Sequence, residues 1–352
     1  MRGFAILTGL VALATILVAC RDEVPTDVPE PESASQPQAV QEARDVDDSL
    51  CVLLDPLVNR GRGLRGVSAY SAVAEAIEEG AAVNVRCAGG ESPLHYAAAS
   101  QGAPVVELLL EHGADVHAVN SAGETPLIYG VVLVAGLDTN NSVLEALLDA
   151  GADVNATKEF GQSALHIAAL AGRSNALATL LAYGPDLGSV DSGGRTALHY
   201  AAIQTVTAEP ARLLLEAGLA PSATAADGTT PLHFAADYGN AEVARLLLRA
   251  GADANPINEV GMSPLHYAAP EGGAALIRVL LEHGADPNIR DTDGRTALHI
   301  AARQNPLSAV AELLLDAGAD PSALDRHGNT ACDVLNRYLS DPETRERICD
   351  LS

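Results

Sequence analysis

The sequence predicts an all-α solenoid of about seven stacked helix-turn-helix units, with short β-hairpin fingers between them and a cap at each end. Two motifs predict it, because each recurs at intervals of 33 to 38 residues and the two series stay in step. The composition agrees, since aromatic residues make up only 3% of a chain that is 48% apolar. A core of Ala, Leu and Val suits helices that pack closely through Ala.

The first motif marks the start of one helix in each unit. Ser or Thr is followed by Pro or Ala and then by Leu, as in Ser92-Pro-Leu-His95. Ser and Thr are favoured helix N-caps, and Pro suits the first helical position. The paired alanines that follow, Ala97 and Ala98 in the first copy, predict a thin helix face against which the next unit stacks closely. The copies begin at Ser92, Thr125, Ser163, Thr196, Thr230, Ser263, Thr296 and Thr330.

The second motif marks the end of the other helix. Val105, Leu108 and Leu109 have helical apolar spacing, and Gly113 after them predicts a left-handed turn that ends the helix. The Asp that usually follows Gly-Ala is typical of a turn. The copies begin at Gly80, Gly113, Gly151, Gly184, Gly218, Gly251, Gly284 and Gly318. One unit cannot bury its own apolar face, so the units have to stack.

The two motifs together resemble the ankyrin repeat over roughly residues 58–340. The resemblance implies an ankyrin-repeat domain at 50–352, with caps near 50–87 and 326–352. It also implies a concave protein-binding surface formed by the fingers and the first helices of the repeats.

Two copies depart from the repeat pattern. The second reads Leu127-Ile-Tyr-Gly130 and carries five extra residues within Val131–Asn141, which we expect to form an inserted loop or a longer helix. The fourth has Gly218-Leu-Ala where Gly-Ala-Asp is usual. The insertion is a candidate for a local binding feature.

Residues 1–19 are expected to be a signal peptide. A single Arg precedes the apolar stretch Phe4–Ala19, which is shorter than the roughly 20 residues that span a membrane. The stretch ends in Leu-Val-Ala-Cys20 and resembles the bacterial lipoprotein signal. That resemblance implies that Cys20 receives a diacylglycerol and becomes the mature N-terminus. An ordinary cleaved leader with an incidental Cys is the alternative.

Residues 20–49 are expected to be a lipidated Cys followed by a disordered, acidic and Pro-rich tether. Arg21, rather than Asp, follows the Cys, and in lipoproteins this favours the outer over the inner membrane. We therefore expect a periplasm-facing protein with a lipid anchor in the bilayer.

Six histidines occupy one position of the first motif. Stacked helices lie roughly 8–10 Å apart, whereas zinc ligands lie about 2 Å from the metal, so neighbouring members cannot share an ion. We expect them to bond backbone and hydroxyl groups, the structural role that the resemblance also implies. No metal, cofactor or catalytic residue is expected, since the chain has no phosphate loop and no hydrolase motif. The six are His95, His166, His199, His233, His266 and His299.

The motif position beside this His is often aromatic, as in Tyr96, Tyr129, Tyr200, Phe234 and Tyr267. Packing between repeats is one interpretation, and an aromatic strip that is partly open to the groove is the other.

Four cysteines besides Cys20 are expected to form two disulfides, Cys51–Cys87 and Cys332–Cys349, in an oxidising compartment. Of the three possible connectivities, the two others would join caps that lie about eight stacking steps, or roughly 70 Å, apart. Four free thiols are the alternative.

A net charge of −25 disfavours nucleic acid and anionic lipid head groups and favours a basic protein partner, although solubility alone also explains it. We expect the monomeric domain to bind this partner on its finger tips and first helices. Phe160, Val260 and Met262 stand out because finger tips are usually polar and the chain has only three Phe and two Met. Phe160 folded against the neighbouring finger is the alternative. The other tip residues are Glu124, Gln162, Arg195, Asp227, Glu259, Asp293, Arg295 and His327, and the helix residues include Asp237, Tyr238, Glu271, Arg303 and Gln304.

The sequence thus predicts a non-catalytic protein-binding module anchored in the bacterial envelope. One hypothesis for its role is an immunity protein that inhibits a secreted toxin directed at the envelope. The alternative is a periplasmic scaffold or stabiliser of envelope proteins.

Overall fold

A computed structural model of the chain describes residues 49–55, 67–100, 102–133, 141–204, 206–270, 273–304, 309–338 and 349. All of them belong to Arg44–Ser352, the second of the two units into which the chain divides. The predicted signal peptide, Cys20 and the tether up to residue 48 lie outside the described residues. So do residues 134–140 of the insertion and Glu271.

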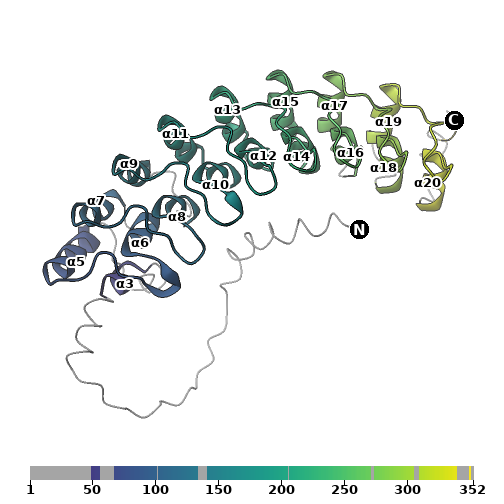
Figure 1. The fold of residues 1–352 in the computed structure, drawn as a ribbon. Helices are drawn as coiled ribbons and strands as arrows, with labels where there is room; N and C mark the ends of the chain where they lie inside the picture. The colour runs from purple at the N-terminus through teal and green to yellow at the C-terminus, as the bar shows by residue number, and fades with distance from the viewer. Residues whose placement is uncertain are drawn as a thin grey trace, which may run out of the picture. The chain divides into compact units, whose positions relative to one another are not determined.

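The described part of this unit is a row of helix pairs in two layers (Figure 1). Each helix contacts the next helix of its own layer, as the stacking of equivalent repeats requires. One layer holds α3 (Ser49–Leu54), α6 (Pro93–Ser100), α8 (Pro126–Leu133), α10 (Ala164–Leu170), α12 (Ala197–Ala202), α14 (Pro231–Asp237), α16 (Pro264–Ala268), α18 (Ala297–Gln304) and α20 (Ala331–Tyr338). The other holds α5 (Val67–Glu78), α7 (Ala103–Glu111), α9 (Asn141–Asp149), α11 (Ser174–Ala182), α13 (Glu209–Glu216), α15 (Ala241–Arg249), α17 (Ala274–Glu282) and α19 (Ala309–Asp316). Seven pairs, from α6–α7 to α18–α19, lie between a cap formed by α3 and α5 and a cap begun by α20.

The core is made of leucines from the two layers and of small residues where the first layer stacks. Leu94, Leu127 and Leu198 are fully buried, as are Ala97 and Ala98. Each fully buried Leu stabilises the fold by about 2 kcal/mol. The predicted thin alanine face is confirmed, because the absence of large side chains lets α6 and α8 approach closely.

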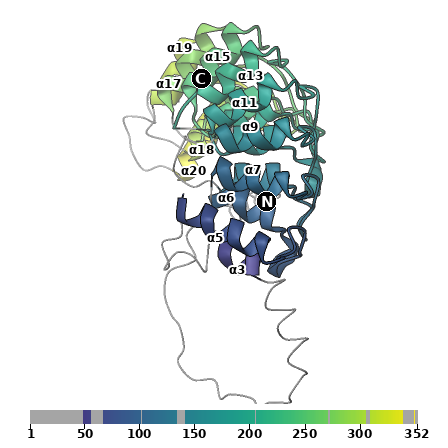
Figure 2. The ribbon, with the colours of Figure 1, turned by 90° about the vertical axis from the view of Figure 1, so that its left-hand side faces the viewer.

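The fingers between successive pairs lie along one edge of the row (Figure 2). Gly113 ends α7 with a φ of 82°, which confirms the predicted left-handed turn. No strand is assigned among the described residues, and the one isolated β-bridge joins Thr157 to Ser163. The expected hairpins are instead tight turns. Each finger forms few backbone hydrogen bonds within itself and also forms a backbone hydrogen bond to the neighbouring finger. The amide of Ser192, for example, donates to the Phe160 carbonyl at 2.8 Å.

The departure in the second repeat keeps the stacking distance. Gly130 replaces the first alanine of the pair, and a Cβ there would lie 3.4 Å from Ala98. Val131, larger than the second alanine, is buried beside it. The inserted loop or longer helix expected within Val131–Asn141 falls mostly on residues 134–140, outside the described residues.

The four cysteines lie in two pairs, one at each end of the row. Cys51 on α3 is bonded to Cys87 in the first finger, with 5.5 Å between the Cα atoms. Cys332 on α20 is bonded to Cys349, with 5.2 Å between the Cα atoms. Each bridge holds a terminal unit that has a stacking neighbour on one side only.

None of the helices within the described ranges is long and apolar enough to cross a membrane.

Candidate functional site

The six motif histidines are buried, and each connects its own repeat to the next. In the first, the backbone amide of Ser92 donates to Nδ1 of His95 at 3.0 Å, so Nδ1 is an acceptor and the ring proton is on Nε2. Nε2 then donates to the carbonyl of Glu124 in the following finger at 2.9 Å. The other five make the same bond to a carbonyl in the next finger, at 3.0 to 3.3 Å. This geometry confirms the structural interpretation of the histidine series.

Burial keeps His95, His166, His199, His233 and His266 neutral, because it lowers the pKa of each. Burial lowers the pKa of His199 and of His233 to about 4. Four of the six rings also meet an aromatic residue of the next repeat edge-on, as His199 meets Phe234 with centroids 5.6 Å apart. Within the described ranges no three His, Cys, Asp or Glu side chains are arranged to hold a metal ion. Tyr96 and Tyr200 are buried while Tyr129, Phe234 and Tyr267 are half-buried, so both interpretations of the aromatic position hold in part.

The three predicted apolar tips differ in exposure. Phe160 is 74% exposed and Val260 is 50% exposed. Met262 is half-buried against the core, and its carbonyl accepts from Nε2 of His233. Met262 therefore belongs to the base of its finger, because it directly precedes the capping Ser263.

Phe160 also has a strained backbone. Its φ of 63° makes it the one residue other than glycine with positive φ within the described ranges. At the corresponding place the first finger has Gly89, with a φ of 84° and a carbonyl that accepts from the next finger in the same way. Non-glycine residues in this region cost on the order of 1 kcal/mol or more. The exposed ring therefore stands on a backbone conformation that glycine adopts at lower cost.

Neighbouring polar residues hold these fingers in place. The ammonium of Lys158 donates to the carboxylate of Glu124 at 3.0 Å, and both side chains are largely buried. Glu124 is thus not the solvated tip expected from its position. Arg195 lies over the ring of Phe234, 5.4 Å from its centroid, and so packs against the following repeat.

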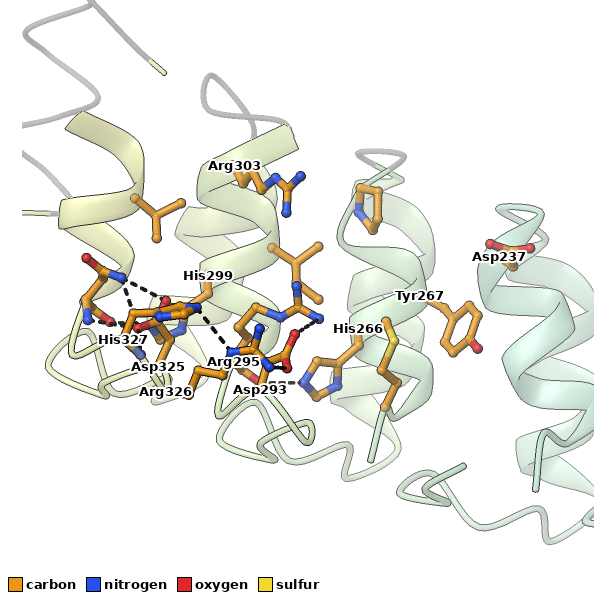
Figure 3. A pocket seen from close by; sticks show the side chains of 15 residues that line it. Asp237, His266, Tyr267, Asp293, Arg295, His299, Arg303, Asp325, Arg326 and His327 are labelled. Carbon is orange, nitrogen blue, oxygen red and sulfur yellow. Dashed lines mark hydrogen bonds and ion pairs between the residues drawn. The ribbon is translucent and has the colours of Figure 1, made fainter. Parts of the chain in front are cut away.

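A pocket of about 480 Å³ opens at the C-terminal end of the row. Its lining comes from the first-layer helices α14, α16, α18 and α20 and from the last three fingers, the first of which contributes Met262 (Figure 3). Arg295 bonds Asp291 at 2.7 Å and Asp293 at 3.2 Å, and Arg326 bonds Asp293 at 2.5 Å. Acidic and basic side chains therefore surround an apolar floor.

The pocket brings together only some of the predicted partner-binding residues. Met262, Asp293, Arg295 and Arg303 line it, together with Asp237 and His327. The others lie outside it, namely Phe160, Arg195, Asp227, Tyr238, Glu259 and Val260.

Several exposed or pocket-lining residues were not predicted from the sequence. Arg326 was missed, although counting back from the capping Thr330 places it at the last finger tip. A second series of exposed apolar residues recurs four residues after the Asp that follows the helix-ending Gly in each motif. Its members are Val119, Val190, Ile257 and Leu324, and the repeat spacing would have revealed them.

Comparisons with known proteins agree with this geometry. The family model described as ankyrin repeats (three copies) matches residues 67–155, 132–225, 208–291 and 251–325. A similar solved structure is the ankyrin repeat domain of Bcl-3, described as a unique member of the IkappaB protein family. It is 31% identical, with a TM-score of 0.54 over 64% of this chain and 99% of that one. No curated protein matches the chain. The motifs, the stacked helix pairs and these matches together establish that the chain belongs to the ankyrin-repeat family.

Proposed function

We propose that this chain is a non-catalytic module that binds another protein through its finger tips and first-layer helices. Ankyrin repeats as a family are protein-interaction modules. The observation that carries the binding of a partner at the finger tips is the exposed ring of Phe160 on a strained backbone. Because the ring is exposed, packing in the free protein does not offset the backbone strain. An interaction of the ring with a bound partner explains why the strained residue is present.

The charge of the chain bears on the partner. A net charge of −25 attracts basic surfaces over distances of about a Debye length, roughly 8–10 Å at physiological salt. Interface centres are enriched in aromatic residues and depleted of acidic ones. A basic protein with an apolar recess for Phe160 satisfies both conditions.

Two further features support a role in the bacterial envelope. The first is the leader that ends in Cys20, and the second is the pair of cysteine bridges, which suits an oxidising compartment. The specific role we propose is immunity, in which the domain covers and inhibits a secreted toxin that attacks the envelope. A scaffold for envelope proteins is the alternative.

Capture of the partner separates these two roles. The chain without residues 1–20 is immobilised and incubated with periplasmic extract, and the bound protein is identified and purified. Stoichiometric addition of the domain abolishes a degradative activity of the partner if the role is immunity. An active or non-enzymatic partner favours the scaffold, and failure to retain any protein would contradict the binding function itself.

Replacement of Phe160 by glycine is expected to weaken binding of the captured partner by about 1–3 kcal/mol or more, because the anchoring ring is lost. The free energy of unfolding should change by less than about 1 kcal/mol, because the relief of positive-φ strain offsets the added flexibility of the unfolded chain. Calorimetric titration and urea unfolding measure the two quantities.

Val206→Ser is the matched control for Phe160→Gly. Val206 is 91% exposed but lies between α12 and α13 rather than in a finger, so its replacement should leave both quantities unchanged. A loss of stability with intact affinity in Phe160→Gly would assign the ring to packing.

Replacement of Cys20 by serine is expected to move the protein from the membrane fraction to the soluble periplasmic fraction. A thioether-linked lipid cannot form on the hydroxyl, and no acyl chains then hold the chain at the bilayer. Cell fractionation with detergent phase partition measures the change. A serine variant that remained as membrane-bound as the wild type would contradict the anchor.

A further inference from the structure

The pocket at the C-terminal end of the row combines an apolar floor with a rim of arginines and aspartates. Tyr267, Ile300 and Val334 contribute apolar surface from three successive first-layer helices. Pro270, just beyond α16, extends this floor. An opening of about 480 Å³ accommodates one large side chain with its flanking backbone.

The three arginines of the pocket differ in how they are paired. Arg295 is held by Asp291 and Asp293, and Arg326 shares Asp293 with it. Arg303 projects from α18 at the rim (Figure 3) and forms no hydrogen bond or ion pair with any residue in the described ranges. Arg326 is also accessible, with 59% of its side chain exposed.

This concentration of arginine is unusual in so acidic a chain. Only 21 of the 352 residues are basic, yet three of them line this one pocket. Two of the carboxylates that face them, Asp291 and Asp293, are already bonded by Arg295. The guanidinium of Arg303 therefore offers unused donors beside an apolar surface, an arrangement that suits a carboxylate.

We propose that this pocket receives a segment of the protein partner in which an Asp or Glu lies next to a large apolar side chain. The carboxylate bonds Arg303, with Arg326 as a second donor, and the apolar side chain packs on Tyr267 and Ile300. This inference rests on the proposed function, since it specifies the chemistry of one part of the bound partner.

The overall charge of the chain defines what kind of partner can deliver such a segment. A free, strongly acidic peptide is repelled by a protein of net charge −25. A single carboxylate within a basic surface meets no such barrier, and it fixes the register of binding because it matches one end of the row only.

Selection of peptides from a random display library on the immobilised chain tests the chemistry without knowledge of the partner. The expected consensus contains one Asp or Glu adjacent to an aromatic or large aliphatic residue. The affinity of the synthesised consensus peptide is then measured by fluorescence anisotropy. We expect Arg303→Glu to lower it by about tenfold or more, because a charge-assisted hydrogen bond is replaced by repulsion.

Arg278→Glu is the matched control, since it makes the same change in net charge on an exposed residue of α17, in the other helix layer. It should alter the affinity by less than about twofold, the size of a screened long-range effect. A peptide with Asn or Gln in place of the acidic residue should bind wild type and Arg303→Glu equally.

Enrichment of Lys- or Arg-rich peptides, failure to enrich any peptide, or equal effects of the two arginine variants would overturn the pocket assignment. The proposed function fails separately. A captured partner that binds Arg303→Glu normally but loses affinity with Phe160→Gly removes only the pocket inference, whereas a chain that retains no protein at all removes the function.

Discussion

The free energy of unfolding of the repeat domain is expected to fall by about 5 kcal/mol between pH 7.5 and pH 4.5 through His199 and His233 alone. Both rings are buried in the neutral form, and burial lowers their pKa from 6.5 to about 4. In the unfolded chain both are solvated and titrate near 6.5. Below that pH the unfolded state therefore binds more protons, and stability decreases as the pH falls.

The hydrogen bonds explain why the folded state resists protonation. Nδ1 of His199 accepts from the backbone amide of Thr196 at 3.1 Å, and Nε2 donates to the carbonyl of Thr229 at 3.3 Å. A second proton on Nδ1 would point at an amide hydrogen and break the helix cap. Because each ring also joins two repeats, protonation weakens the cap and the inter-repeat bond together.

The loss of stability through His199 and His233 falls between pH 6.5 and pH 4. Burial lowers the pKa of His95, His166 and His266 as well, so these residues add to the loss in the same direction. Asp325 has a lowered pKa of about 2, under hydrogen bonds from Asn329 and His327 that outweigh its desolvation. Its stabilisation is present above its ordinary pKa of 3.8 and is lost only as the pH falls from there towards 2.

Urea unfolding at a series of pH values measures this loss. His199→Gln is the informative variant, since an amide can occupy the site without titrating. It should be less stable than wild type at pH 7.5, and its stability should depend less on pH by up to about 1.4 kcal/mol per pH unit. A free energy of unfolding that is constant between pH 7.5 and pH 4.5 would contradict the prediction.

The repeat architecture could be predicted because each of its determinants is local and recurs. Thr196 at a helix start and Gly113 at a helix end act within one turn of chain, and eight copies of each motif make the pattern unambiguous. The role of the histidines followed from distance alone, since packed helices of any protein lie too far apart for neighbouring members of the series to share a metal ion. Repetition also made the departure at Gly130 visible, although its packing against Ala98 depends on the three-dimensional arrangement of the two helices.

The candidate binding surface was less predictable because it depends on the orientation of side chains from different repeats. Nothing in the sequence distinguishes Met262, which packs at a finger base, from Val260, which is exposed two residues before it. The positive φ of Phe160 could not be predicted either, because Val260 at the equivalent place of a later finger accepts the same bond without it. The pocket requires four first-layer helices and three fingers to be placed together, so Arg326 and Arg303 come to line one pocket only in three dimensions.

Loss of the N-terminal bridge is expected to destabilise the domain by about 4 kcal/mol, and loss of the C-terminal bridge by about 3 kcal/mol. The difference follows from loop closure in the unfolded chain, because the bridged cysteines are 36 and 17 residues apart. The double variants Cys51→Ser with Cys87→Ser, and Cys332→Ser with Cys349→Ser, isolate the two contributions.

These losses should be confined to the ends of the row. In a solenoid each unit contacts only its neighbours, so a weakened cap unfolds before the repeats behind it do. Hydrogen exchange should therefore accelerate in α3 and α5 for the N-terminal variant and in α20 for the C-terminal one, while α12 to α15 keep their protection. Free thiols at all four positions in peptides mapped without reduction, or an unchanged stability of both variants, would contradict the pairing. A reductant added to the wild type should reproduce the combined loss of stability. The quadruple serine variant should be unaffected by the reductant, because it has no disulfide bridge to reduce.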